Sequence, residues 1–257
     1  MSNLSDTFKN GKAFIAFITG GDPDIETTEK LLYAMSETGA DIIEIGIPFS
    51  DPIAEGPVIQ AASQRSLDAG CTTDKLFDLA AKVSSNISTP LVFMTYINPI
   101  YTYGKDKFMK KCRESGIKGV IIPDLPFEEK DELSPFCDKY EIDLISLIAP
   151  TSNERITMIA KEAKGFVYCV SSLGVTGVRS EITTDVNAMT NLVRQSSDIP
   201  CAIGFGISTP EQAAKMSKAA DGVIVGSAIV KIVAQYGKDC IEPVKEYVKS
   251  MKEAISK

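Results

Sequence analysis

Eight short, continuous apolar runs recur along this chain, and they limit its fold more than any other feature. Each run lacks the alternation of a strand with one wet face, as expected for parallel strands covered on both sides. Amphipathic helical stretches separate the runs, and the first of these lies between a capping Asp24 and a terminating Gly39. The runs occupy residues 13–19, 41–47, 90–96, 119–125, 143–149, 165–171, 200–206 and 222–228.

This regular alternation predicts a closed (β/α)8 TIM barrel, preceded by an extra N-terminal helix. We expect a single domain over residues 1–257, because no composition break or low-complexity linker interrupts the chain. Barrels of roughly 250 residues commonly form one domain. An open, doubly wound sheet is the competing architecture, and a count of eight strands favours closure.

The spacing of the strands predicts where the active site lies. Most strand starts are about 22–28 residues apart, near the minimum for one βα unit. Two gaps are longer, about 50 residues after the second strand and about 35 after the sixth, so we expect long loops there. Both loops follow the C-terminal ends of strands, which carry the active site in such barrels. The second contains the Gly-rich stretch "SSLGVTGVRSE" (171–181), which predicts a mobile flap.

Composition argues against several classes of function. The formal net charge is −7, which disfavours general nucleic-acid binding. No apolar run approaches the roughly 18–20 residues that span a bilayer, and the polar N-terminus has no signal-peptide core. Six widely spaced cysteines indicate a reduced, cytoplasmic protein. Histidine is absent, which excludes zinc-hydrolase sites and His-activated nucleophiles. Acid–base chemistry therefore depends on carboxylates, Tyr, Lys or Cys.

Two carboxylates stand out near the second strand. Glu44 interrupts the apolar run of residues 41–47, where charged groups are rare, and it faces either the barrel lumen or the outer helices. In the lumen its pKa would rise and fit it for proton exchange near neutrality. Glu55 lies in the loop "IAEGP" (53–57) and gains weight only as a partner of Glu44, because two acids in different settings can hold different protonation states.

Glycine-rich segments follow the last three strands. They are "GVTG" (174–177), "GFG" (204–206) and "GS" (226–227). Loops after strands 7 and 8 that open onto a helix N-terminus form the usual phosphate site of such barrels, and Gly lets backbone N–H groups approach the phosphate oxygens. These three segments together predict a phosphate-binding site.

Three other features have two interpretations each. Asp22 and Asp24 could form a metal-binding pair, but a helix cap is favoured because a helix begins there. Asp124 is a loop or capping acid unless it reaches the pocket. The apolar and aromatic residues of "YINPIYTYG" (96–104) crowd a predicted loop after the third strand. They form either an exposed docking surface or a segment folded back over the barrel.

The motif "IEIGIPFSDPIAEGPVIQ" (43–60) resembles the signature of the tryptophan synthase alpha subunit family. The resemblance covers the whole chain, because "FITGGDPD", "YINPIYTYG", "PDLPFEE", "SSLGVTG", "GFGIS" and "GSAIV" follow in the family's order and spacing. It implies cleavage of indole-3-glycerol phosphate to indole and glyceraldehyde 3-phosphate, in the pathway of tryptophan biosynthesis. It also implies an alpha2beta2 complex in which only the partner beta subunit carries pyridoxal phosphate. The chain itself would need no metal or organic cofactor.

The resemblance also implies roles for particular residues. Glu44 would be the main acid–base group, and Glu55 would meet the indole N–H. Tyr168 would contact Glu44 and the glycerol part of the substrate. The remaining roles are an indole pocket of Phe17, Tyr96, Ile121 and Phe205, phosphate binding by Gly177, Gly206, Gly226 and Ser227, loop closure through Asp51 and Thr176, and a partner interface at Pro48, Asn98, Pro99 and Ile100.

One departure from the family pattern concerns Glu55, because the second acid in this family is most often Asp. The extra methylene moves the carboxylate by about one bond, and a misplacement near 1 Å can cost roughly a hundredfold in rate. We expect the loop backbone to compensate. Three alternative functions stay open: a self-sufficient lyase that releases free indole, a catalytically silent phosphate-binding regulator, and another phosphate-binding barrel such as a prenyl or thiamine phosphate synthase.

Overall fold

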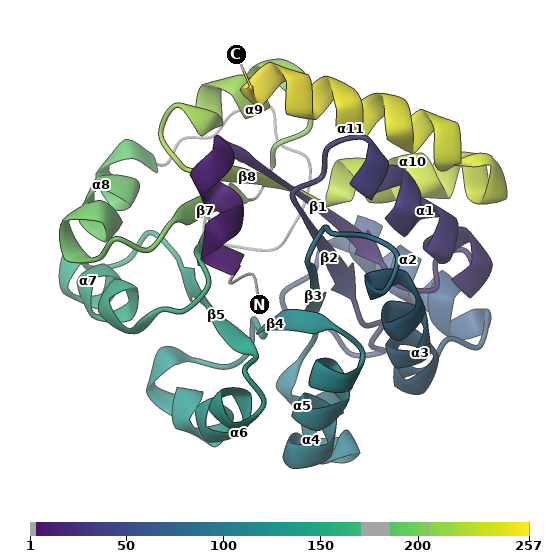
Figure 1. The fold of residues 1–257 in the computed structure, drawn as a ribbon, viewed down its shortest axis with the longest axis horizontal. Coiled ribbons are helices and arrows are strands. Elements are labelled where there is room, and N and C mark those ends of the chain that lie inside the picture. Colours follow the sequence, from purple (N-terminus) through teal and green to yellow (C-terminus); the bar gives the residue numbers. More distant parts are fainter. Residues whose placement is uncertain (1–3, 171–185, 205, 257) are drawn as a thin grey trace.

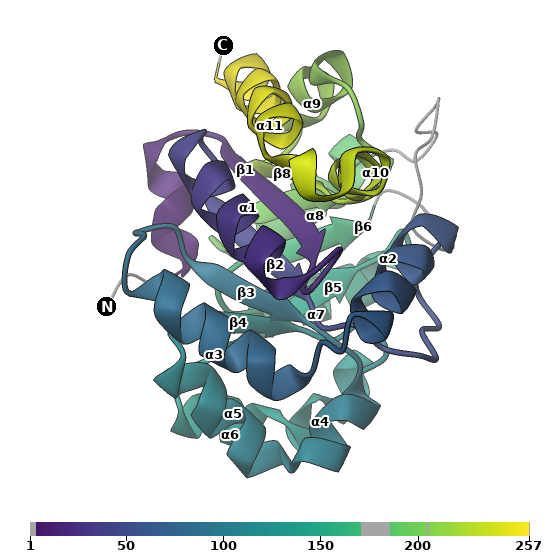
Figure 2. The same cartoon turned by 90° about the vertical axis from the view of Figure 1, so that its right-hand side faces the viewer.

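Eight parallel strands close into a barrel in the order β1 to β8, with helices packed around it (Figures 1 and 2). The computed structural model describes residues 4–170, 186–204 and 206–256. Closure confirms the predicted TIM barrel and excludes the open sheet. The strands are β1 (Ala13–Thr19), β2 (Ile42–Gly46), β3 (Leu91–Met94), β4 (Ile117–Ile121), β5 (Asp143–Ile148), β6 (Val167–Val170), β7 (Cys201–Gly204) and β8 (Gly222–Val225).

Helices follow every strand, and several connections carry more than one. The α-helices are α1 (Ile25–Glu37), α2 (Pro57–Asp68), α3 (Thr73–Ser84), α4 (Ile97–Tyr103), α5 (Lys105–Glu114), α6 (Ser134–Lys139), α7 (Asn153–Glu162), α8 (Val186–Ser196), α9 (Pro210–Ser217), α10 (Ser227–Tyr236) and α11 (Ile241–Ile255). The 3-10 helices are η1 (Leu4–Asn10), η2 (Phe127–Glu132) and η3 (Gly237–Asp239). The extra N-terminal helix is therefore present, as 3-10 helix η1.

Side chains along each strand alternate between the helix-facing core and the lumen, as the period of two requires. On β2, Ile43 and Ile45 join the large core beneath the helices, whereas Ile42 joins a separate cluster inside the barrel. Glu44 therefore shares the lumen face with Ile42. This alternation resolves the choice left open by the sequence, and it places Glu44 inside the barrel.

Helix η1 covers the N-terminal end of the barrel, opposite the predicted active site. Leu4 is fully buried in the lumen cluster, and the ring of Phe8 lies 5.6 Å from that of Phe166. Figure 1 shows this helix, in purple, lying across the strands. Helix η1 thus packs against the lumen cluster at this end of the barrel.

Ion pairs at the start of two strands fix the barrel register. Asp41 accepts hydrogen bonds from the backbone N–H of Phe14 and from Lys252 Nζ, both at 2.6 Å, which ties β1 and β2 to α11. Asp221 repeats the arrangement before β8, because it accepts from the Cys201 N–H at 3.0 Å and from Arg194 at 3.1 Å. Backbone donors that open a buried strand are satisfied in this way.

Two expectations about the connections need correction or qualification. Residues 97–103 form helix α4 instead of a loop, and the Ile100 side chain of this helix is fully buried. Tyr103 packs against Phe77 and Phe108, while Tyr101 keeps 46% of its surface exposed. The segment therefore folds back over the barrel for the most part. The long connection after β2 consists of a loop and the additional helix α2.

Candidate active site

Glu44 lies at the C-terminal end of the lumen with its carboxyl group removed from water. The residue is 1% exposed, and its Oε1 atom has no hydrogen-bond partner among the described residues. Desolvation raises the pKa of Glu44 to about 8. Its register partners are Phe17 on β1 and Val92 on β3, so apolar side chains flank it on the lumen face. Such a group is protonated at neutral pH and can donate a proton.

Glu55 lies in the loop between β2 and α2, and the hydroxyl of Tyr96 holds it. Tyr96, the N-cap residue of α4, donates to the Glu55 carboxylate and accepts from the Ala54 N–H at 3.1 Å. Burial raises the pKa of Glu55 to about 7, and the Tyr96 hydrogen bond limits that rise. One oxygen, Oε2, is buried without a partner among the described residues. The pKa values of both carboxyl groups therefore lie near neutrality, where groups serve proton transfer best.

Phe17 forms the apolar wall beside Glu44, and two glycines make room for its ring. A Cβ atom on Gly46 would lie 2.7 Å from the ring, and one on Gly226 would lie 3.1 Å from it. Helix α2 contributes Ile59 and Ala62 to the same cluster. The β8–α10 junction therefore touches the aromatic wall, which brings a predicted phosphate site next to a predicted indole pocket.

Tyr168 on β6 faces the lumen from the strand opposite β2. It is 7% exposed, and desolvation together with the charge of Glu44 raises the pKa of its hydroxyl. A Cβ atom on Gly204 would lie 2.4 Å from that hydroxyl, so the neighbouring strand must carry glycine here. Ile121 belongs to the same lumen cluster. Four of the five residues expected to contact substrate, Phe17, Tyr96, Ile121 and Tyr168, therefore line the lumen or its mouth, and the fifth, Phe205, lies outside the described residues.

The phosphate-binding residues are described only in part. Gly226 is the N-cap of α10, and Ser227 is the first residue of that helix, so its free backbone N–H groups and positive end face the mouth. Gly206 adopts a φ of 84°, which favours glycine. Gly177 and the loop residue Thr176 lie outside the described residues.

The expected loop-closure and partner residues occupy unequal environments. Asp51 is exposed and accepts a hydrogen bond from Ser50 at 2.5 Å. Asn98 is exposed and Pro99 is half-buried, but Pro48 is buried and Ile100 is 0% exposed. Ile100 therefore cannot contact a partner through its side chain unless α4 moves, whereas Asn98 can. Ile53, in the loop between β2 and α2, is 73% exposed, although sequence analysis did not single it out.

Three acids of uncertain role now have partners. Asp24 caps α1 through the Thr27 N–H at 2.7 Å, as favoured, and Asp124 accepts from the Ile97 N–H at 2.9 Å at the start of α4. Asp22 is 2% exposed and accepts hydrogen bonds from Nε and Nη2 of Arg65, at 2.8 and 2.7 Å. This ion pair fastens α2 to the loop after β1. In the described part of the chain, no three His, Cys, Asp or Glu side chains gather as a metal site would require.

Sequence analysis missed one lumen residue, Thr19. It lies two positions beyond Phe17 on β1, is 3% exposed, and its Oγ1 has no described hydrogen-bond partner. A polar residue at the end of an apolar strand was the available signal. Among the described residues, no helix is both long and apolar enough to cross a bilayer.

These observations define a (β/α)8-barrel enzyme with two carboxyl groups at its C-terminal mouth, each with a buried oxygen that lacks a described partner. The family model of the tryptophan synthase alpha chain matches residues 4–256. The alpha chain of Lacticaseibacillus casei is 48% identical over 255 residues, covering 99% of this chain and 96% of that protein. That of Caldanaerobacter subterraneus is 49% identical, covering 98% and 97%. The chain therefore belongs to the tryptophan synthase alpha chain family, whose members are carbon–carbon lyases.

Solved structures agree with this assignment. A structure of Mycobacterium tuberculosis tryptophan synthase superposes with a TM-score of 0.91 at 31% identity, covering 100% of this chain and 99% of that one. The tryptophan synthase alpha chain of Legionella pneumophila gives 0.88 at 36% identity, covering 99% and 98%. These similarities extend over nearly the full length of each chain.

Proposed function

We propose that Glu44 and Glu55 together carry the reaction of this family, the retro-aldol cleavage of indole-3-glycerol phosphate to indole and glyceraldehyde 3-phosphate. The observation that supports this most directly is their environment. Each carboxyl group has a buried oxygen without a described partner, and their pKa values are about 8 and about 7. Groups poised near neutrality serve proton transfer best.

Glu44 supplies and then removes the proton. Indole is a poor leaving carbanion, so the ring carbon that bears the glycerol chain is protonated first, and Glu44 is the donor. The resulting carboxylate accepts the proton of the adjacent glycerol hydroxyl as the carbon–carbon bond breaks. The bonding electrons return to the ring, and the hydroxyl carbon becomes the aldehyde of glyceraldehyde 3-phosphate. Glu44 therefore donates one proton and accepts one, and it ends the reaction in its starting protonation state.

Glu55 stabilises the positive charge that forms on the ring. Protonation of the ring carbon makes the indole nitrogen iminium-like, and a carboxylate at its N–H lowers the energy of that state. Tyr96 holds Glu55 for this task, while Phe17 and Ile121 provide apolar surface for the ring. At the other end of the substrate, the N-terminus of α10 with Gly226 and Ser227 binds the phosphate.

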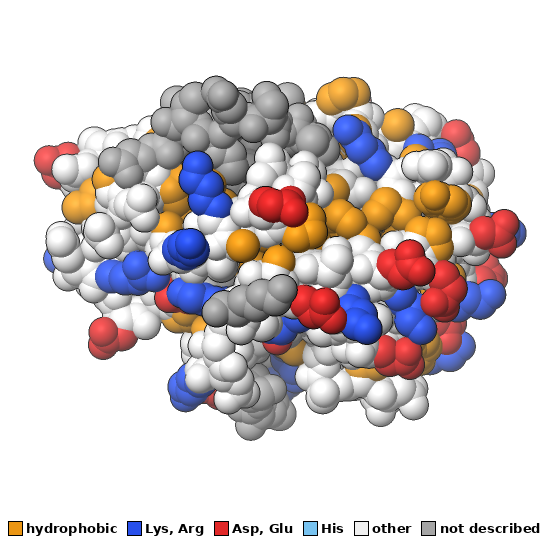
Figure 3. All heavy atoms as spheres, turned by 90° about the horizontal axis from the view of Figure 1, so that it is seen from above, with side chains coloured by type: hydrophobic (Ala, Val, Ile, Leu, Met, Phe, Trp, Pro, Cys, Tyr) orange, Lys and Arg blue, Asp and Glu red, His pale blue; other side chains and the backbone are white. Residues whose placement is uncertain are grey.

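The proposal includes a partner. A pyridoxal-phosphate beta subunit would receive the indole in an alpha2beta2 complex, and Asn98 and Pro99 are the exposed or half-exposed residues of the expected interface. The same proposal places the chain in the cytoplasm, since its six cysteines are all free and buried. Acidic and basic side chains are interspersed on the face drawn in Figure 3, a pattern unlike a nucleic-acid site.

An indole-release assay tests this function. The purified chain should cleave indole-3-glycerol phosphate slowly alone and faster with a beta subunit, both in the presence of EDTA. Glu44→Gln should lower kcat about a hundredfold or more, the usual scale of acid–base catalysis. Unchanged indole release by Glu44→Gln would remove its role, and absence of release under every condition would favour a silent barrel.

A further inference from the structure

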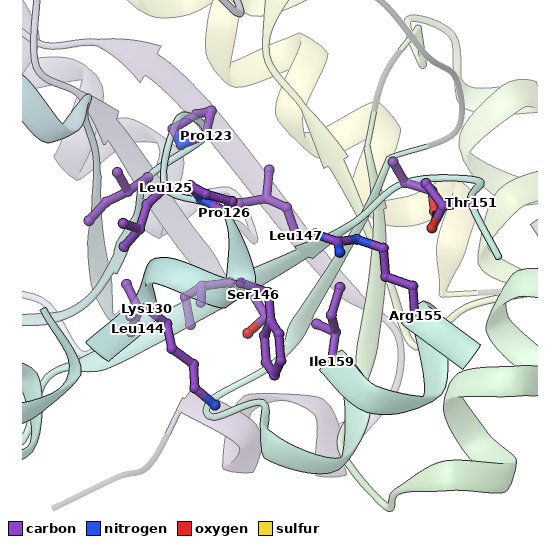
Figure 4. Close-up of a pocket in the computed structure, with 14 residues that line it drawn as sticks. Pro123, Leu125, Pro126, Lys130, Leu144, Ser146, Leu147, Thr151, Arg155 and Ile159 are labelled. Atoms are coloured by element: carbon purple, nitrogen blue, oxygen red, sulfur yellow. Dashed lines mark hydrogen bonds between the residues drawn. The ribbon is translucent and has the colours of Figure 1, made fainter. Parts of the chain in front are cut away.

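A lateral cavity opens in the barrel wall where β4 and β5 separate. The two strands pair as far as Ile121 and Ile145, after which β5 continues along β6 to Ile148. The chain after β4 turns away into η2. The cavity left between β5, η2 and α7 measures about 190 Å³ (Figure 4).

The walls of this cavity are mainly apolar and reach the lumen. Phe127 and Ile159 line it from η2 and α7, outside the barrel. Ile145 and Leu147 line it from β5, and both pack in the lumen cluster that contains Ile121. The cavity and the proposed indole pocket therefore share one layer of side chains.

The polar groups at the cavity narrow the choice of ligand. Arg155 and Lys130 stand at the rim, but each is already paired, with Glu128 and Glu162 respectively. The rim thus carries no uncompensated positive charge for an anion. Ser146 lines the cavity from the middle of β5, and its hydroxyl can accept a hydrogen bond. A neutral ligand with one hydrogen-bond donor fits this lining.

We propose that the lateral cavity binds a small neutral aromatic molecule of the class of indole, whose N–H donates to the Ser146 hydroxyl. This inference rests on the proposed function, which makes indole the chain's own product. Apolar cavities of about 150 Å³ bind benzene, so a volume near 190 Å³ accommodates a slightly larger ring system. The lining of this site contains neither Glu44 nor Glu55, and none of the proposed phosphate-binding residues.

Equilibrium dialysis with indole tests the site on the full chain. The chain contains no tryptophan, so indole fluorescence is read against tyrosine alone. A non-cleavable indol-3-yl alkyl phosphate at saturation occupies the lumen. We expect one indole per chain to remain bound in its presence. Ser146→Phe, which fills the cavity, should abolish this binding, and Ser146→Ala should weaken it about threefold to tenfold through the lost hydrogen bond.

Met158→Phe is the matched control, because Met158 lies on α7 and is 40% exposed away from the cavity. It should leave binding unchanged, and circular dichroism of each variant checks its fold. Loss of all indole when the lumen is occupied would overturn the proposal, as would binding that neither Ser146 variant alters. If the phosphate analogue does not bind, the proposed function fails. The difference in indole binding between wild type and the Ser146 variants then still shows whether the lateral cavity binds indole. Lateral binding without lyase activity would uphold the cavity and refute the function.

Discussion

The Tyr96 hydroxyl joins the carboxylate of Glu55 to the backbone of the same loop. It donates to the Glu55 side chain and accepts from the Ala54 N–H at 3.1 Å, so one side chain at the start of α4 positions the second acid and lowers its pKa. The ring of Phe49 lies 5.5 Å from that of Tyr96 and packs it from the same loop. A flexible Glu in a loop thereby gains a defined place.

Removal of that hydroxyl should shift the pH profile of the enzyme. A hydrogen bond to the ionised carboxylate lowers its pKa, so Tyr96→Phe should raise the pKa of Glu55 above its value of about 7. If Glu55 acts in its ionised form, the acid limb of kcat/KM moves to higher pH. The alkaline limb, set by loss of the Glu44 proton near pH 8, should stay in place. A pH series of kcat/KM measures both limbs.

Tyr103→Phe is the control for that experiment. The Tyr103 hydroxyl also binds a carboxylate, Asp74, at 2.5 Å, but it lies on the outer surface of the barrel between α4 and α3. This variant should keep the wild-type pH profile. An acid limb that does not move in Tyr96→Phe would show that Glu55 does not titrate in the rate-limiting step.

Shortening the second acid tests whether the loop has adapted to Glu. Glu55→Asp withdraws the carboxylate by about one bond, and a displacement near 1 Å can cost roughly a hundredfold. Because Tyr96 and the Ala54 backbone hold the longer side chain here, we expect kcat to fall. Steady-state kinetics with and without a beta subunit measure it. A large rise in turnover would instead show that Glu55 is a defect relative to the family pattern.

Burial of Glu44 should make the fold less stable as pH rises. Its folded-state pKa of about 8 exceeds the unfolded value of 4.5, so the folded state holds a proton that the unfolded chain releases between these pH values. Stability is therefore highest below the unfolded pKa and declines as pH increases toward 8. Glu44→Gln removes this titration. Its stability advantage over wild type should grow by about 3 kcal/mol between pH 5.5 and pH 8.5.

Urea denaturation at the two pH values checks this expectation. The comparison uses the change in the gap between the two proteins, so any constant effect of the amide cancels. A gap that does not change with pH would mean that Glu44 is ionised in the folded state at neutrality, and its role as a proton donor would then fall.

Strand periodicity in the sequence was sufficient for the barrel, but not for the residues that shape the site. Seven of the eight apolar runs each contain one whole strand of the barrel. The exception is β4, which begins at Ile117, two residues before the start of its run at residue 119. The direction of the Glu44 side chain could not be predicted, because an unbroken apolar run does not indicate which of its residues face the lumen. Gly46 and Gly204 leave space for Phe17 and Tyr168 on neighbouring strands, and such a pairing depends on register, which the sequence does not reveal.

The helix over residues 97–103 was missed for a local reason. Pro99 and the aromatic residues favour an irregular segment, and the helix is stabilised from outside by Asp124, which accepts from the Ile97 N–H, and by burial of Ile100. These are tertiary contacts between β3 and β4 connections. Propensity within a short window cannot report them.

The ion pair between buried Asp22 and the partly exposed Arg65 should stabilise both the fold and the active-site loop. Asp22 is 2% exposed, and Arg65 binds it through two hydrogen bonds from α2, the helix that begins two residues after Glu55. Arg65→Met leaves the buried carboxylate unpaired and should cost about 3 kcal/mol in unfolding free energy. It should also lower kcat, because α2 carries Ile59 and Ala62 of the Phe17 cluster.

Lys82→Met provides the matched comparison, since Lys82 pairs with Glu29 at 2.7 Å but its side chain is 62% exposed. Exposed pairs contribute about 1 kcal/mol or less, so this variant should remain close to wild type in stability and in kcat. Arg65→Lys keeps the charge but loses the bidentate geometry. Its stability and kcat should therefore lie between those of Arg65→Met and Lys82→Met. Equal effects of Arg65→Met and Lys82→Met on urea midpoint and turnover would show that the Asp22–Arg65 pair does not hold α2 in place.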